Sequence, residues 1–133
     1  MTDFMQIAIE EARKAARKGE VPIGAVIVRG GKVIAKAHNL REKKRSALAH
    51  AEVLAIHKAC RRLRNWRLAG CEMYVTLEPC AMCMGAIQNA RIDRVVFGAK
   101  AVDSGQPAVD SSFIENDECG AIIREFFKKR RNS

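Results

Sequence analysis

Two short motifs constrain this chain more than anything else in its sequence. Residues 50–52 read His-Ala-Glu, and residues 79–83 read Pro-Cys-Ala-Met-Cys. Together they supply one imidazole, two thiols and one carboxylate, and imidazole and thiolate are donors that zinc prefers. Three protein ligands leave the fourth corner of a tetrahedral zinc ion open, which separates a catalytic zinc site from a structural one. We therefore expect a fold that brings both motifs to one zinc ion, Zn2+.

The spacing within each motif suits such a site. His50 lies at the start of a helix predicted over residues 49–63, and Cys80 and Cys83 lie at the start of another that begins at Pro79. Side chains three positions apart on a helix point to one face. The partial positive charge of a helix N-terminus also lowers a thiol pKa and favours the thiolate. His50, Cys80 and Cys83 are therefore the predicted metal ligands.

Glu52 is the predicted catalytic residue. Because it is only two positions from His50, it cannot readily bind the same ion, but it can reach a water molecule in the open position. There it would take a proton and pass it on as a general acid and base, with zinc activating the water. The alternatives are a redox CxxC, which leaves residues 50–52 unexplained, and a structural zinc. The latter needs a fourth ligand, for which the formal candidates are His38, His57, Cys60, Cys71 and Cys119.

Bulk composition favours one compact domain over residues 1–133. The chain is 48% hydrophobic, and it has neither an apolar run of about 20 residues, as a membrane helix needs, nor an apolar secretory segment. We therefore expect a cytoplasmic protein with no membrane partner. Its 5 cysteines are an odd number, which argues for metal binding or free thiols over a disulfide framework. The net charge of +9 makes a nucleic acid a plausible partner, although many basic proteins bind none.

The hydrophobic pattern predicts a layered α/β domain. Apolar residues recur at helical spacing in residues 3–18, 49–63, 79–90 and 118–129, and strand-like runs occupy residues 21–28, 32–37, 72–76 and 92–97. The Gly30–Gly31 pair predicts a hairpin between the first two strands. Residues 101–116 are typical of a loop with at most a short strand at 112–114, and residues 128–133 of a helix end with a frayed basic tail.

Further segments carry a family resemblance. They are EVPIGAV at 20–26, HN at 38–39, AHAE at 49–52, NWRL at 65–68, YVTLEPC at 74–80, GAI at 85–87, ARI at 90–92 and ECG at 118–120. The pair H-x-E and P-C-x-x-C is itself the signature of zinc nucleobase deaminases. On these motifs the chain closely resembles the tRNA-specific adenosine deaminases (TadA-like) of the cytidine/deoxycytidylate deaminase superfamily, over most of its length.

The resemblance implies a three-layer α/β/α fold with a mixed sheet of four to five strands, usually in a homodimer. It implies hydrolysis of the wobble adenosine in a tRNA anticodon loop to inosine, with zinc on His50, Cys80 and Cys83 and proton transfer by Glu52. The substrate-binding residues that it implies are Asn39, Pro22, Ile23, Ala51 and Leu77. A flipped base needs such apolar walls with a few polar groups. Pro22 and Ile23 would otherwise be a packed strand start, and Asn39 a turn residue.

The chain also departs from the family pattern. Ser46-Ala47-Leu48 stands where the family commonly has Asp-Pro-Thr, and Ala101 stands where it has an Asp that touches the nucleic acid. The segment leading to Glu118 is shorter than expected, too short for the usual fifth strand. These departures fall where RNA is held, so a deaminase of a free base or nucleoside, of the guanine or cytosine type, is the alternative. A non-catalytic zinc-containing RNA-binding subunit is a third possibility, against which Glu52 argues.

Overall fold

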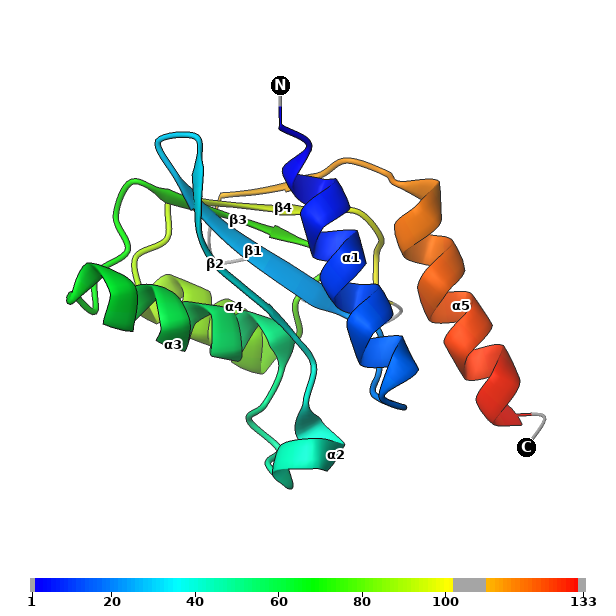
Figure 1. Ribbon diagram of the computed structural model, residues 1–133. Coiled ribbons are helices and arrows are strands. Elements are labelled where there is room, and N and C mark those ends of the chain that lie inside the picture. The colour runs from blue at the N-terminus through cyan, green and yellow to red at the C-terminus, as the bar shows by residue number, and fades with distance from the viewer. Residues whose placement is uncertain (1, 102–109, 132–133) are drawn as a thin grey trace.

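Five strands form one mixed sheet at the centre of the molecule (Figure 1). The computed structural model describes residues 2–101 and 110–131. The sheet order is β2-β1-β3-β4-β5, where β1 pairs antiparallel with β2 and β3, and β3, β4 and β5 run parallel. The strands are β1 Gly24–Arg29, β2 Lys32–His38, β3 Cys71–Val75, β4 Arg94–Phe97 and β5 Ser111–Phe113.

Helices cover both faces of this sheet (Figure 1). On one face lie α1 (Phe4–Arg17) and α5 (Asp117–Arg131), and on the other lie α3 (Ala51–Leu63) and α4 (Ala81–Asn89). The expected three-layer α/β/α fold with four to five strands is therefore confirmed, with five strands. No helix in the described part of the chain is long and apolar enough to cross a membrane.

The main core lies between the sheet and the α3–α4 layer. Ala51, Ala55 and Ala59 are fully buried and recur every four residues, so one face of α3 is lined with methyl groups. Such small side chains let the helix approach the sheet closely, where it packs against Ala35 and Ala37 of β2. A smaller cluster joins α1 to the opposite face of β1. Alternate residues of β1 and β2 therefore face different helix layers.

Three elements differ from the sequence-based expectation. The segment before Glu118 was expected to be too short for the usual fifth strand and to hold at most a short strand at 112–114. A short fifth strand is present, because β5 (Ser111–Phe113) pairs with β4 over Val95–Phe97. A strand of three residues needs little chain, and it covers the edge that β4 would otherwise expose. A four-residue helix, α2 (Arg41–Lys44), was not predicted, and α5 continues to Arg131, two residues beyond the expected helix end at residue 129. Residues 102–109 of the loop expected over 101–116 lie outside the described residues.

Short backbone links bring the starts of α3 and α4 to the same end of the sheet. The Leu40 N–H, just after β2, donates to the Ala49 oxygen at 3.0 Å, immediately before α3. After β3, the Thr76 N–H donates to the Gly24 oxygen at 3.1 Å, and the Gly24 N–H donates to Thr76 Oγ1 at 3.2 Å. The two motifs found in the sequence therefore emerge beside each other.

Candidate metal centre and active site

The three predicted ligand residues lie together at the starts of two helices. His50 and Cys80 are the residues that precede the first turns of α3 and α4, and Cys83 lies within the first turn of α4. The His50 Nδ1 atom is 3.5 Å from Cys83 Sγ and 3.8 Å from Cys80 Sγ. Zinc bonds of about 2.0 Å to nitrogen and 2.3 Å to sulfur place tetrahedral ligand atoms roughly 3.5 Å apart. The group therefore has the spacing of a metal site, with Nδ1 as the imidazole donor.

The local sequence explains why these side chains are free to bind an ion. Ser, Thr, Asp or Asn before a helix usually bonds the first backbone N–H groups, but His50 and Cys80 make no such capping bond. Burial and the nearby Arg41 lower the pKa of His50, which favours the neutral imidazole that binds metals. Burial, together with Glu52 and Cys80, raises the pKa of the Cys83 thiol. A cation bound beside that thiol would displace its proton.

Glu52 lies in the first turn of α3 and is almost completely buried, with 3% of its surface exposed. Burial raises its pKa to about 6, and the backbone and Cys83 offset this only in part. Its Oε1 atom is the one buried side-chain oxygen or nitrogen without a hydrogen-bond partner in the described part of the chain. A buried carboxylate oxygen without a partner is costly to leave unsatisfied. The donor set and this oxygen together fit a metal ion with a water molecule beside it.

The other candidate ligands lie elsewhere. Within the described residues, only His50, Cys80 and Cys83 form a group of three that could hold a metal ion. His38 instead contacts Glu11 and Lys18, and the Cys60 thiol faces the Trp66 oxygen at 3.6 Å. His57, Cys71 and Cys119 are likewise outside the group. The three ligands thus have no fourth protein partner among the described residues.

The structure also locates the residues expected to bind substrate. Asn39 follows β2 and is 4% exposed, and its side-chain amide makes no hydrogen bond to another described residue. Pro22 and Ile23 immediately precede β1, where Ile23 packs against the main core. Ala51 is fully buried in that core. Leu77 lines a groove between the end of β4 and α5.

One polar cluster was not anticipated from the sequence. The Glu11 carboxylate, on α1, accepts a hydrogen bond from Lys14 Nζ at 2.6 Å and lies 2.9 Å from His38 Nδ1. Lys18 Nζ lies 2.9 Å from the other ring nitrogen of His38. Glu11 and His38 are 27 positions apart, so no local pattern could have paired them. The signal available in the sequence was an acidic residue on the otherwise small, apolar face of α1.

Replacing Glu11 by glutamine is expected to destabilise the protein in a pH-dependent way. Burial opposes ionisation of Glu11, but Lys14 and His38 outweigh it and hold the pKa of Glu11 below its ordinary value of 4.5. The native charge therefore contributes stability above about pH 4.5 that is lost as the pH falls through the lower native pKa. We expect Glu11→Gln to lower the free energy of unfolding by about 1–3 kcal/mol near neutrality. The difference from wild type should shrink in acid.

Urea unfolding at several pH values measures this effect. Glu10→Gln is the matched control, because Glu10 is exposed on the same helix and carries the same charge. An equal loss of stability in both variants would contradict the role assigned to the Glu11 contacts.

The fold and the metal-binding group together define a deaminase. A family model described as MafB19-like deaminase matches residues 1–131, nearly the whole chain. A structure from a study of A-to-I editing by tRNA:A34 deaminases at the wobble position is similar, with a TM-score of 0.84 and 41% identity. It covers 90% of this chain and 97% of that one.

Comparison with related sequences shows which family of deaminases the chain belongs to. The tRNA-specific adenosine deaminase of Bacillus subtilis is 48% identical over 144 residues, covering 96% of this chain and 89% of the relative. The chain belongs to the tRNA-specific adenosine deaminase family of the cytidine deaminase superfamily. A more distant structure, the guanine deaminase of Bacillus subtilis, is 30% identical with a TM-score of 0.71, covering all of this chain and 96% of that one.

Proposed function

We propose that this protein is a zinc-dependent hydrolase that converts adenosine to inosine at the wobble position of a tRNA anticodon. The observation that carries the proposal is the unpartnered, buried Oε1 of Glu52 beside a group of one imidazole and two thiols. Family membership supports the substrate, because the curated relatives are tRNA-specific adenosine deaminases. We propose further that the whole chain forms one such domain.

His50, Cys80 and Cys83 would hold the zinc ion. When bound, zinc supplies Lewis acidity, which lowers the pKa of water towards neutrality. Glu52 takes one proton from the attacking water, since its pKa near 6 keeps it mostly ionised and still able to return a proton. The water oxygen bonds to C6 of the purine as Glu52 passes this first proton to the ring nitrogen. Glu52 then takes the second proton from the hydroxyl on C6 and gives it to the amine, whose bond to C6 breaks. The amine departs as ammonia, and the oxygen remains on the base as the inosine carbonyl.

The pocket would be built from the residues on either side of this group. Asn39 would hydrogen-bond the nucleoside, which would satisfy an amide that has no other hydrogen-bond partner in the described chain. Pro22, Ile23 and Leu77 would form apolar walls, and Ala51, which the resemblance also places among the substrate-binding residues, would support them from the core. Such a pocket takes a base only after it leaves the stack, and a base in an anticodon loop leaves its stack at low cost.

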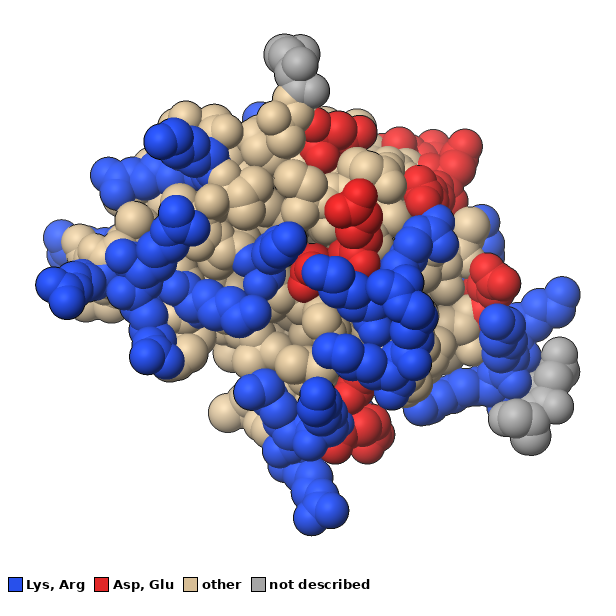
Figure 2. Space-filling view, viewed as in Figure 1, with Lys and Arg blue, Asp and Glu red and all other residues tan. Residues whose placement is uncertain are grey.

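The surface charge supports a nucleic-acid substrate. Lys and Arg side chains dominate the face shown in Figure 2, over α2, α3 and the lower part of α1, while Asp and Glu gather at the upper right. The basic residues of α2 are Arg41, Lys43 and Lys44, and Arg41 is close enough to His50 to lower its pKa. Positive charge beside the site would attract the phosphates of an anticodon loop or another single-stranded nucleic acid. A tRNA substrate would also fit the expected cytoplasmic location.

We further propose a homodimer, as the resemblance implies. Leu48, two residues before His50, is 61% exposed, and Met82, directly before Cys83, is 37% exposed. Large apolar side chains exposed around a site are typical of an interface. A dimer formed there would enclose each metal group with residues from the second copy.

A second candidate function is deamination of free guanine. The guanine deaminase of Bacillus subtilis matches the whole chain in three dimensions. In addition, Ala101 stands where the family has an acidic residue that contacts the nucleic acid, and here its N–H donates to Glu78 Oε1 at 3.2 Å. A non-catalytic zinc-containing subunit remains the third candidate.

Ammonia release from a panel of substrates separates these functions. We expect turnover of an RNA stem-loop with adenosine at the wobble position and at most a trace from free guanine, cytosine or adenosine. The stem-loop KM should rise steeply with salt, because each neutralised phosphate releases counterions. Turnover of guanine alone would favour the second function, and RNA binding without ammonia release would favour the third.

A further inference from the structure

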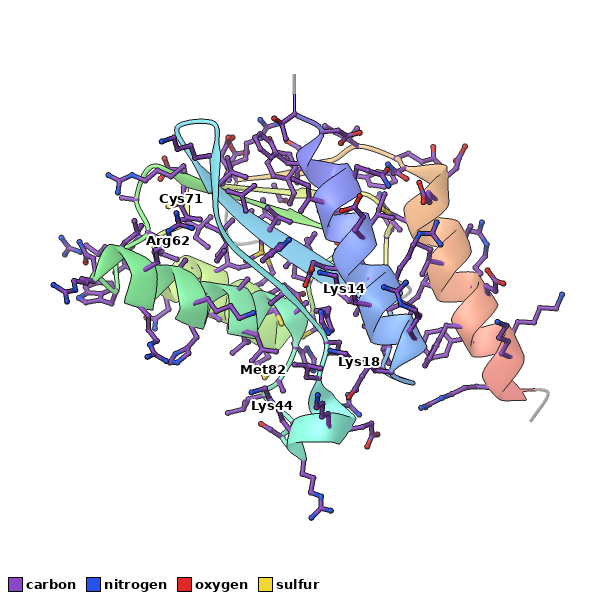
Figure 3. The ribbon with its side chains drawn as sticks, viewed as in Figure 1. Lys14, Lys18, Lys44, Arg62, Cys71 and Met82 are labelled. Atoms are coloured by element: carbon purple, nitrogen blue, oxygen red, sulfur yellow. The ribbon has the colours of Figure 1, made fainter. Side chains whose placement is uncertain are left out.

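His38, at the end of β2, is held by charged side chains of α1. Its Nδ1 atom lies 2.9 Å from Glu11 Oε1, and its Nε2 atom lies 2.9 Å from Lys18 Nζ. Lys14 Nζ donates to the second Glu11 oxygen at 2.6 Å. Figure 3 shows Lys14 and Lys18 on the side of α1 that lies next to β2. The Glu11 and His38 side chains are only 6% and 11% exposed, so this pair is largely shielded from water, whereas the two lysines reach the surface.

These contacts fix which atoms of the imidazole donate. A lysine ammonium can only donate, so His38 Nε2 accepts from Lys18. Nδ1 then carries the proton and donates to Glu11. The ring is thereby held in one tautomer and one orientation by Glu11 of α1 and by Lys18 at the end of that helix, about two turns away.

The next residue faces the other side of the sheet. Along β2, Ala35 and Ala37 face the α3–α4 layer, whereas His38 faces α1. Asn39 follows the same alternation and faces the side of Ala35 and Ala37. Its N–H donates to the Ile23 oxygen at 3.1 Å, so the strand geometry extends to this residue. A fixed His38 side chain therefore directs the Asn39 side chain towards the layer that carries the metal group.

Asn39 is also connected to that group through the backbone. The following residue, Leu40, donates to the oxygen of Ala49, which precedes His50. The Asn39 side-chain amide makes no hydrogen bond to another described residue and is not among the fully buried unpartnered groups, so its own contacts do not fix its orientation. Its position depends on the residues that flank it.

Helix α1 is itself in direct contact with the sheet at this point. A Cβ atom added to Gly24, the strand partner of His38, would lie 1.9 Å from the Ala8 oxygen and 2.9 Å from Glu11 Cβ. The backbone of α1 therefore rests on β1 without space for a side chain between them. This close contact fixes the position of Glu11 relative to His38, so that Glu11 can hold the imidazole in place.

We propose that Glu11 and His38 are positioning residues for the substrate, acting through Asn39 from the opposite face of the sheet. The Glu11–His38 pair holds the end of β2 so that the Asn39 amide points at the bound nucleoside. This inference rests on the proposed function, and neither residue touches the substrate.

A double-mutant cycle with Asn39 tests the proposal. Steady-state kinetics on the wobble-adenosine stem-loop are measured for wild type, His38→Ala, Asn39→Ala and the double variant. Because positioning affects substrate binding in the ground state and the transition state alike, we expect His38→Ala to raise KM about five- to tenfold and to change kcat little. In the Asn39→Ala background the same change should have no further effect. If the increases in KM of the two single variants multiplied in the double variant, the two residues would act independently and the proposal would be overturned.

Matched variants distinguish an effect on substrate positioning from the effects of a lost charge or of unfolding. Glu11→Gln should raise KM like His38→Ala, whereas Glu10→Gln, with the same charge change at an exposed position, should leave KM within about twofold. His38→Asn places an amide N–H near the position of Nδ1 and should restore most of the loss. Zinc content and thermal melting of each variant exclude unfolding. Equal kinetics for Glu11→Gln and Glu10→Gln would contradict the proposal, whereas an inactive wild type would overturn the proposed function itself.

Discussion

Glu52→Gln is expected to lower kcat on the stem-loop by about 10²- to 10⁴-fold, the usual contribution of a general acid–base residue. Glutamine has nearly the same size and occupies the same buried position, but its amide cannot take a proton from water. Stopped assays of ammonia or inosine, run at high enzyme concentration, measure the residual rate.

The binding properties of the Glu52→Gln protein should remain. Zinc content and stem-loop affinity are expected to match wild type, because the three ligands and the surface charge around α2 are unchanged. Thermal stability should not fall, since the substitution removes a carboxyl group whose pKa burial raises to about 6. Glu10→Gln serves as the charge-matched control. Wild-type turnover in the Glu52→Gln protein would refute proton transfer by this residue.

Loss of a ligand should have an equally large effect, with a different signature. His50→Ala and Cys83→Ser are expected to reduce bound zinc from about one ion per chain to nearly none and to abolish turnover. They should also remove the stabilisation that zinc provides, which is about 4 kcal/mol when free zinc exceeds its Kd a thousandfold. Elemental analysis and melting curves with and without a chelator measure both losses.

Cys60→Ser is the matched control for the cysteine variant. The Cys60 thiol is half-buried and lies outside the metal-binding group, and a serine there can still donate to the Trp66 oxygen. We expect unchanged zinc content and turnover. Full zinc occupancy in Cys83→Ser would show that the ion is held elsewhere.

The sequence was sufficient to predict the meeting of His50 with the two cysteines, for a physical reason. Each motif starts a helix with a clear apolar period, and the donor types admit few other uses. The layered α/β architecture was also predictable from the hydrophobic periods of the helices and strands. The starts of α3 and α4 were each placed two residues early, because His50 and Cys80 lie just before their helices instead of within them.

Contacts between distant segments could not be predicted in this way. The Glu11–His38 pair joins residues 27 positions apart, and its formation depends on how closely α1 approaches Gly24. Short elements were harder to predict for another reason. The four residues of α2 are too few to show a period, so this helix was not predicted, and the three residues of β5 allowed only an uncertain short strand to be placed at 112–114.

The hydrogen bonds that anchor α2 affect how the protein would bind a polyanion. Glu20 is 1% exposed, and its two carboxylate oxygens accept the N–H groups of Glu42 and Lys43 at 3.1 and 2.8 Å. The basic turn cannot swing outwards without leaving a buried acceptor unsatisfied. Binding of a single-stranded nucleic acid would therefore cost little conformational entropy in α2, because this helix is already ordered in the folded protein.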